Sequence, residues 1–349
     1  RSLERIYHYY QGYVSGKTGH RPFDKSIEEW VGEIKPDRVN VIPLIEERDY
    51  MLKSHNIVRD FLEEKELEEQ RVFLARSDPA LNYGLISAVL INKIALTRLQ
   101  RLDESVSTDI YPILGAGSAP FRGNLCPHRV ENTLEEYPFV QTFTIQSAFK
   151  YDYSKEEASK SVKKIRSSKR GSMEPVDERK CLSLIEKSRQ DYREKVLKLT
   201  GTVNKVSEHV PSRRSRKLHV GLFGYSRGIE GAGEEIKLPR AIKFTSSLYS
   251  IGIPPEIIGF SALSEGDVDF LLDGAYKKIL TDLEDSMKYY NENMLKEFPF
   301  LKEDVEAVKE YIDVEISEEH KKFTDNVLNG DEEEMKSNIV NAAKVRKFL

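Results

Sequence analysis

Two acidic residues each follow a short apolar run of the chain. Glu46 comes after Val41–Ile45, and Asp78 comes after Val72–Ala75 with only an arginine and a serine between them. Short apolar runs that are bounded by turn formers and followed by helical stretches are typical of buried parallel strands, whose carboxyl ends meet at one edge of a sheet. Two carboxylates at that edge, with few histidine or cysteine ligands nearby, predict a site for Mg2+ or Mn2+. The alternative is that each carboxylate caps the helix that follows it.

A third apolar run, Tyr111–Leu114, leads into a glycine-rich segment that contains an arginine. The candidate ligand-binding residues of this segment are Gly115, Gly117, Ser118, Arg122 and Gly123. Closely spaced glycines let backbone N–H groups approach an anion, and a guanidinium group adds a bidentate hydrogen-bonding fork. The segment therefore predicts a phosphate or carboxylate site, with an ordinary tight loop as the alternative.

Two more arginines stand beside later apolar runs. Arg227 follows Leu218–Phe223 and Arg240 precedes Ala241–Leu248, and both runs are predicted strands. Positive charge that converges opposite two carboxylates is the arrangement expected for a metal ion with an anionic, phosphorylated substrate. The alternative for both residues is an ordinary surface arginine.

Helices and further strands must bring these residues together. Apolar spacing predicts helices over 47–69 and 82–102, and a fourth strand over Phe139–Ile145 that ends at Gln146. Alternation of strands and helices with short connections is the pattern of right-handed crossover units. The predicted fold class is therefore α/β, a TIM-barrel-like (β/α)8 fold with many additional helices. We count six strands where such a barrel needs eight, so the first strands are expected to precede Arg1.

The chain divides into three predicted parts. A helix and a loop occupy 1–35, and the strands and helices that carry the site occupy 36–263. A polar insertion at 154–217 interrupts the second part and contains a long helix. The last part, 264–349, has a helical and acidic pattern throughout, which predicts an all-helical C-terminal region.

Composition excludes several classes of protein. The 349 residues carry 54 basic and 58 acidic side chains, a net charge of -4, so no polyanionic or membrane partner is expected. A basic cluster at 160–170 lacks interleaved aromatic residues and is interpreted as a solvated loop, which argues against nucleic-acid binding. Two cysteines are too few for a disulfide framework and indicate a reducing compartment, with the cytoplasm as the expected location. No apolar stretch reaches the roughly 18 residues that a membrane span requires.

Five segments together resemble the short, archaeal-type family of phosphoenolpyruvate carboxylase. They are Pro43–Glu46, Arg76–Asp78, Gly115–Gly123, Thr144–Gln146 with Phe149–Tyr151, and Leu238–Ile242, and they occur in the family's order. The resemblance implies that bicarbonate carboxylates phosphoenolpyruvate to oxaloacetate and phosphate with Mg2+ or Mn2+, through carboxyphosphate and a metal-stabilised enolate. It also implies carbon dioxide fixation by an allosteric homotetramer.

The resemblance assigns roles to single residues. Glu46 and Asp78 would hold the metal ion. The residues that it places at the substrate are Arg122, Gln146, Arg227 and Arg240. Of these, Arg122 matches the arginine of the family's glycine-rich loop, which stabilises carboxyphosphate and the enolate, whereas Arg227 and Arg240 would bind the substrate phosphate.

Three departures from the pattern of the larger bacterial and plant enzymes bear on this assignment. Ala116 and Leu81 stand near the positions where those enzymes have an arginine and a lysine, which places the chain with the short family. The family's catalytic histidine lies in an N-terminal His-Pro motif that is absent from this sequence, so it is expected in a preceding part of a longer protein. The asparagine-rich tail that binds aspartate is also absent from the sequence, which argues against feedback inhibition by aspartate.

Two other functions stay open at this point. One is another Mg2+-dependent barrel enzyme, a lyase or aldolase that acts on a phospho- or keto acid. The other is a non-catalytic assembly subunit or nucleic-acid binder that uses the basic clusters at 160–170 and 213–217. Bicarbonate-dependent release of phosphate separates the first from a carboxylase, and salt-dependent binding to RNA or DNA would identify the second.

Overall fold

A parallel four-stranded sheet forms the centre of the first half of the chain. The computed structural model describes all residues except 1, 37–38, 64, 213–227 and 231–234. The strands are β1 (Leu44–Ile45), β2 (Glu69–Ala75), β3 (Asp109–Gly115) and β4 (Thr142–Phe143). They pair in the order β1-β2-β3-β4, so the order along the sheet is the order along the chain, as expected for successive crossover units. All four predicted strands of this region are confirmed, although β1 and β4 are short.

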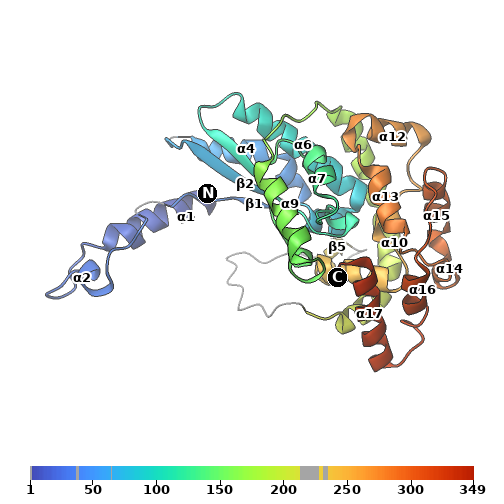
Figure 1. Ribbon diagram of the computed structural model, residues 1–349. Helices are drawn as coiled ribbons and strands as arrows, with labels where there is room; N and C mark the ends of the chain where they lie inside the picture. The colour runs from blue at the N-terminus through green and yellow to red at the C-terminus, as the bar shows by residue number, and fades with distance from the viewer. Residues whose placement is uncertain (1, 37–38, 64, 213–227, 231–234) are drawn as a thin grey trace.

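Helices cover one face of this sheet, as Figure 1 shows. The elements that join the strands are α3 (Arg48–Leu52), α4 (Ser54–Leu62), α5 (Ser77–Tyr83), α6 (Leu85–Asp103), η3 (Pro120–Arg122) and α7 (Val130–Glu136). Along β2, Val72 and Leu74 are fully buried while Arg71 and Phe73 are partly exposed, so in the middle of the strand only one face is sealed by apolar packing. Helix α6 is buried on nearly all sides, because α3, α4, β3 and α10 (Glu178–His209) all pack against it.

The predicted crossover helices differ from the structure at their ends. The helix expected over 47–69 is two helices, α3 and α4, joined at Lys53, whose backbone (φ -103°, ψ 9°) is not helical. The helix expected over 82–102 is α6, and it is preceded by the short α5. Gly84 separates α5 from α6 with φ +86°, a conformation that favours glycine.

One predicted strand is wrong. Residues Ala241–Leu248 belong to a helix, α11 (Ala241–Ser250), and not to a sixth strand. Its buried apolar residues, Ala241, Phe244 and Leu248, recur three and four positions apart, which is the spacing of a helix face. Pro239 lies two residues before the helix, where a missing N–H costs nothing. The segment is also apolar overall, which is why its sequence resembles a buried strand as well as a helix.

The predicted strand Leu218–Phe223 lies outside the described residues. Two short strands, β5 (Gly228–Glu230) and β6 (Glu235–Lys237), form an antiparallel pair beyond it. The described part of the chain is thus a mixed α/β structure with one parallel sheet, and the six-stranded count is not reproduced there.

Helices make up most of the remaining structure. Between β4 and β5 lie α8 (Ala148–Tyr151), α9 (Lys155–Ser167) and α10, which is longer than the helix expected around 176–199. The elements after α11 are η4 (Pro255–Ile257), α12 (Glu265–Phe270), η5 (Leu271–Ala275), α13 (Ile279–Met287), α14 (Met294–Glu297), η6 (Pro299–Leu301), α15 (Lys302–Lys309), α16 (Glu318–Thr324) and α17 (Glu332–Arg346). The expectation of an all-helical region after 264 is confirmed.

The N-terminal segment extends away from the rest of the chain (Figure 1). It consists of α1 (Ser2–Tyr9), η1 (Tyr10–Val14), η2 (Ser15–Lys17) and α2 (Ile27–Val31).

One continuous hydrophobic core connects the sheet, α6, α10 and the C-terminal helices. Boundaries at 35/36 and 263/264 therefore stay predictions. Within the described ranges, the structure contains no helix that is both long and apolar enough to cross a membrane.

Candidate active site

The carboxyl ends of the four parallel strands carry the predicted site residues. Glu46 follows β1 directly, and Asp78 lies in the first turn of α5, which follows β2. Arg122 ends η3 after β3, and Gln146 comes three residues after β4. Because neighbouring strands run in the same direction, with Ile45 paired to Leu74, these side chains belong to one edge of the sheet. The structure therefore brings together residues that are spread over a hundred positions of the sequence.

Arg122 is a buried cation at this edge. Its side chain is only 5% exposed, and its guanidinium group donates a hydrogen bond to Oε1 of Gln146. Its Nε atom is buried and has no hydrogen-bond partner within the described residues. Burial lowers the pKa of Arg122 to about 10, and the negative charge of Asp78 opposes that shift. The guanidinium group is thus a buried positive charge at neutral pH.

Gly117 lies directly beneath this guanidinium group. A Cβ atom at position 117 would stand 2.7 Å from Cζ of Arg122, so only glycine leaves room for the side chain. The loop closes on itself through Gly117 N–H to Arg122 C=O at 2.7 Å and Leu125 N–H to Gly117 C=O at 2.8 Å. The amides of Gly117 and Gly123 are therefore occupied within the loop, which differs from the expectation that they face an anion. Gly117 leaves room for Arg122, whereas Gly123 lies against Ala116 and Arg76.

Arg76 supports the loop from behind. This side chain is fully buried and donates through Nη1 to the carbonyl of Phe121 at 3.1 Å and through Nε to the hydroxyl of Tyr137 at 3.2 Å. A buried arginine that donates to a loop carbonyl restricts that loop, because breaking the bond would leave a buried charge unsatisfied. The strand pattern of the sequence predicts no role for Arg76, although its position two residues before Asp78 indicates that it lies near the site.

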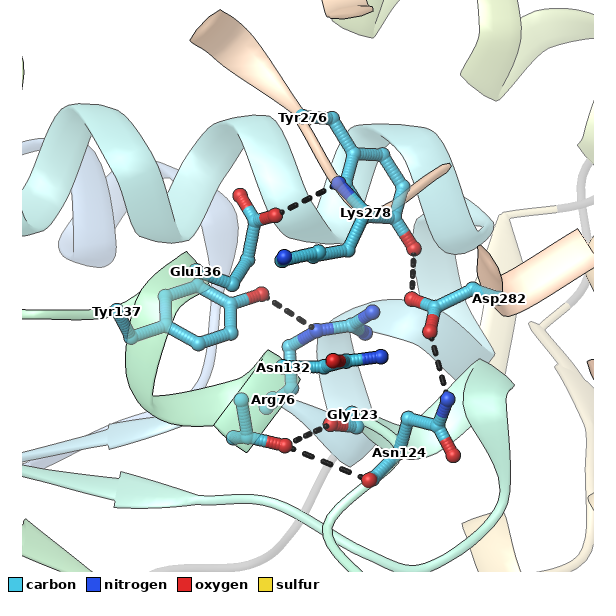
Figure 2. A pocket seen from close by; sticks show the side chains of 10 residues that line it. Arg76, Gly123, Asn124, Asn132, Glu136, Tyr137, Tyr276, Lys278 and Asp282 are labelled. Carbon is cyan, nitrogen blue, oxygen red and sulfur yellow. Dashed lines mark hydrogen bonds between the residues drawn. The ribbon is translucent and has the colours of Figure 1, made fainter. Parts of the chain in front are cut away.

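A small polar cavity of about 10 Å3 lies on the other side of Arg76 (Figure 2). The lining residues are Arg76, Gly123, Asn124, Asn132, Thr133, Glu136, Tyr137, Tyr276, Lys278 and Asp282. Asp282 accepts hydrogen bonds from the hydroxyl of Tyr276 and from Nδ2 of Asn124, the latter at 2.8 Å. Burial raises the pKa of Asp282 to about 7. Through Asn124, this network ties the end of the glycine-rich loop to α13.

Arg240 directly precedes α11, the helix that packs against the loop. It is the residue that precedes the first turn of α11, it is half-buried, and its carbonyl accepts the N–H of Phe244 at 2.9 Å. The ring of Phe244 packs against the ring of Phe121, with 5.9 Å between centroids, and Phe121 is the neighbour of Arg122. Helix α11 and the glycine-rich loop are therefore in direct contact. Arg227 lies outside the described residues.

The remaining candidates of the loop lie at its start. Gly115 is the last residue of β3, and a Cβ atom there would stand 2.9 Å from the ring of Phe73. Ser118 is 7% exposed and follows Gly117 in the closed part of the loop. Both residues lie between the end of β3 and Arg122, which keeps them at the predicted edge of the sheet.

The carboxylates at this edge fit a hard divalent ion. Across the described ranges, no group of three or more histidine, cysteine, aspartate or glutamate side chains is placed to hold a metal. Glu46 and Asp78 are both half-buried, and their carboxylates are of the kind that binds a hard divalent ion. Mg2+ is bound in this way, by one or two carboxylates with water and substrate oxygens completing the shell. The unpartnered donor of Arg122 in the same edge suits an anionic substrate on such an ion.

Comparisons with known proteins identify relatives along the whole chain. A family model described as phosphoenolpyruvate carboxylase matches residues 1–349. The phosphoenolpyruvate carboxylase of Methanothermobacter thermautotrophicus is 44% identical over 353 aligned positions, which cover 99% of this chain and 71% of that protein. That of Methanospirillum hungatei is 43% identical and covers 100% and 72%, and that of Pyrococcus abyssi is 42% identical and covers 99% and 71%. The chain therefore belongs to the phosphoenolpyruvate carboxylase family, and its relatives of this kind come from archaea.

Proposed function

We propose that this chain catalyses the carboxylation of phosphoenolpyruvate by bicarbonate, with oxaloacetate and phosphate as products. The observation that carries the proposal is the position of Glu46, Asp78, Arg122 and Gln146 after four successive parallel strands of a chain that belongs to this family. Carboxylates for a metal ion and a buried guanidinium group for an anion are the two kinds of group that the reaction needs.

Glu46 and Asp78 are the proposed ligands of Mg2+ or Mn2+. When bound, the ion supplies positive charge for the enolate oxygen that develops as the phosphoryl group leaves phosphoenolpyruvate. The two carboxylates come from adjacent strand ends, so their separation is set by the sheet and not by flexible loops. Their partial exposure leaves room for substrate oxygens beside the ion.

Arg122 is the proposed partner of the transferred phosphoryl group. Bicarbonate attacks phosphorus, the bond from phosphorus to the enol oxygen breaks, and carboxyphosphate and an enolate result. The guanidinium group lies in a buried setting, where a hydrogen bond to an anion is stronger than in water. Gln146 holds the guanidinium group through one hydrogen bond and leaves Nε of Arg122 for the substrate. Burial also limits water, which would protonate the enolate to pyruvate.

Arg240, with Arg227, is the proposed phosphate-binding group on the opposite side of the substrate. Gly115 and Ser118 are proposed to contact the substrate, whereas Gly117 leaves room for Arg122 and Gly123 lies against Ala116 and Arg76. The half-buried position of Arg240 directly before α11, which packs against the loop, supports this placement.

The finer features of the family are also part of the proposal. The parallel sheet is proposed to belong to a TIM-barrel-like fold, and the working protein is proposed to be a homotetramer. Allosteric regulation would accompany that assembly. Both cysteines are free and buried, which fits a reducing compartment such as the cytoplasm.

The test is the release of phosphate from phosphoenolpyruvate by the complete protein with Mg2+, measured with and without bicarbonate. We expect phosphate release to require bicarbonate and to match oxaloacetate formation in amount. Phosphate release that is independent of bicarbonate, with pyruvate as the other product, would contradict carboxylation. Turnover of phosphoenolpyruvate without phosphate release would favour another barrel lyase.

A further inference from the structure

Phe121 is the residue through which the glycine-rich loop is attached to its surroundings. Its carbonyl accepts a hydrogen bond from Arg76, and its ring packs against Phe244 and Tyr192, with centroids 5.9 and 6.3 Å away. Its N–H donates to Oε1 of Glu256 at 2.5 Å. Since Arg122 is the next residue, the position of its backbone follows from these contacts.

Glu256 is an unusual partner for a loop amide. It lies in η4, it is 1% exposed, and 135 positions separate it from Phe121 in the sequence. Its Oε1 atom also accepts the hydroxyl of Tyr249, on α11, at 2.7 Å. Its Oε2 atom is buried and has no hydrogen-bond partner within the described residues. Burial raises the pKa of this carboxyl to about 8, so its role at neutral pH is that of a neutral acceptor.

One oxygen atom of Glu256 therefore joins two elements that carry proposed phosphate-binding arginines. Phe121 precedes Arg122 in the loop, and Tyr249 belongs to the helix that begins directly after Arg240. A buried carboxyl without an ion pair adds little to the stability of the fold through its charge, because burial penalises the ionised form. The two hydrogen bonds to Glu256 instead fix the position of the loop relative to the helix.

We propose that Glu256 is a positioning residue, which holds Arg122 of the glycine-rich loop in register with α11 and Arg240 through its contacts with Phe121 and Tyr249. The inference rests on the proposed function of Arg122, and it extends that function to a residue that does not touch the substrate. Loss of the acceptor would leave the buried N–H of Phe121 without a partner, and the loop would shift to satisfy it.

The experiment compares Glu256→Gln with Glu256→Leu in the complete protein. Glutamine keeps an Oε1 acceptor of the same reach, whereas leucine keeps the volume and removes the acceptor. We expect Glu256→Leu to lower kcat about tenfold or more with a smaller change in KM for phosphoenolpyruvate, and Glu256→Gln to stay within about threefold of the parent. Amide hydrogen exchange of segment 119–124 should accelerate in the leucine variant and stay slow in the glutamine variant.

Asp304→Leu provides the matched control. Asp304 is also a fully buried carboxyl that accepts a backbone N–H, from Ser261 at 3.0 Å, but it belongs to α15 and pairs with Lys195. Its replacement should lower thermal stability without changing the exchange of segment 119–124 or the kcat of the folded protein. A loss of kcat in Asp304→Leu equal to that in Glu256→Leu would overturn the inference, because general destabilisation would then explain both.

Other outcomes also decide the matter. An unchanged kcat in Glu256→Leu, or a lowered kcat with unchanged exchange of segment 119–124, overturns the inference. If Glu256→Leu does not fold, Glu256→Asp takes its place, since it shortens the side chain by one methylene, and full activity with protected amides in that variant overturns the inference. An inactive Arg122→Ala beside a fully active Glu256→Leu rejects this inference alone. An active Arg122→Ala rejects the proposed role of Arg122 itself, and with it the functional part of the inference.

Discussion

The guanidinium group of Arg122 rests directly on the backbone of Gly117. A side chain at position 117 would bring its Cβ atom within 2.7 Å of Cζ, 2.9 Å of Nη2 and 3.0 Å of Cβ of Arg122. All three contacts are closer than van der Waals packing allows. The loop is closed by the hydrogen bond from Gly117 N–H to Arg122 C=O, so neither backbone can move aside without breaking it. Glycine at 117 is therefore a condition for the position of the arginine.

Gly117→Ala should consequently displace Arg122 and lower kcat about tenfold or more, with thermal stability lowered only slightly. Steady-state kinetics and a thermal melt of the same preparation measure the two effects. The matched control is Gly201→Ala, since Gly201 lies within α10 and a Cβ atom there meets nothing within 4 Å. That variant should keep full activity and gain up to about 1 kcal/mol of stability. Full activity of Gly117→Ala would show that the arginine has another way to be seated.

Removal of either proposed metal ligand should abolish the response to metal. We expect Asp78→Asn and Glu46→Gln to lower activity at a fixed Mg2+ concentration about 100-fold or more while the fold is retained. Titration with Mg2+ and Mn2+ measures the apparent metal affinity, and circular dichroism checks the fold. Glu47→Gln is the control, because Glu47 is exposed and its side chain makes no capping hydrogen bond with α3. A metal response of Asp78→Asn equal to that of the parent would remove Asp78 from the site.

Arg122 and Gln146 should differ in the size of their effects on turnover. Arg122→Ala removes the charge and should lower kcat about 100-fold or more, while the apparent affinity for metal changes less. Gln146→Ala removes only the acceptor that holds the guanidinium group and should lower kcat roughly tenfold. Gln141→Ala serves as the control, because Gln141 is exposed and directly precedes β4. An effect of Arg122→Ala on metal affinity that exceeds its effect on kcat would mean that the loop is structural.

The sequence patterns that predicted the sheet are local ones. Val72–Ala75 and Tyr111–Leu114 are short apolar runs that end at an arginine and a glycine, so strand and boundary can both be read from neighbouring residues. The same kind of signal failed for Ala241–Leu248, where apolar residues at helical spacing sit among small polar ones. Propensity alone does not separate these cases, because tertiary packing decides which face is buried.

The supports of the site were not predictable in this way. Glu256 and Asp282 lie 135 and 158 positions from the residues of the loop that they bind. Asp282 has acidic neighbours in the sequence and Glu256 stands alone in the apolar stretch Ile253–Phe260, and neither setting indicates a contact with the loop. The sequence could thus indicate Glu46, Asp78 and Arg122, which follow strands, but not the residues that reach the loop from the C-terminal half of the chain.

Stability should depend on pH through the buried carboxyls. The pKa of Glu256 is raised from 4.5 to about 8 and that of Asp282 from 3.8 to about 7, so the folded chain holds protons that the unfolded chain has released. Their contribution to the free energy of unfolding therefore falls as pH rises from about 4 towards 8. His320 acts in the opposite sense, because burial lowers its pKa to about 3, and its contribution levels off as the pH rises above 6.5, where the unfolded chain also loses this proton.

At pH 7 the folded chain keeps Glu256 mostly protonated and Asp282 about half protonated, so between pH 7 and 8 Glu256 makes the larger contribution to the decline. Denaturant unfolding of the parent should show a free energy that declines over this interval, with a slope of up to about 1.4 kcal/mol per pH unit from one proton. Glu256→Gln cannot release a proton and should flatten the decline. Asp282→Asn is the control, since it should flatten the curve mainly below and around pH 7 and change the interval from 7 to 8 less than Glu256→Gln does. An equal decline in the parent and in Glu256→Gln would show that the carboxyl is already ionised in the folded chain, and that Phe121 and Tyr249 donate to a carboxylate.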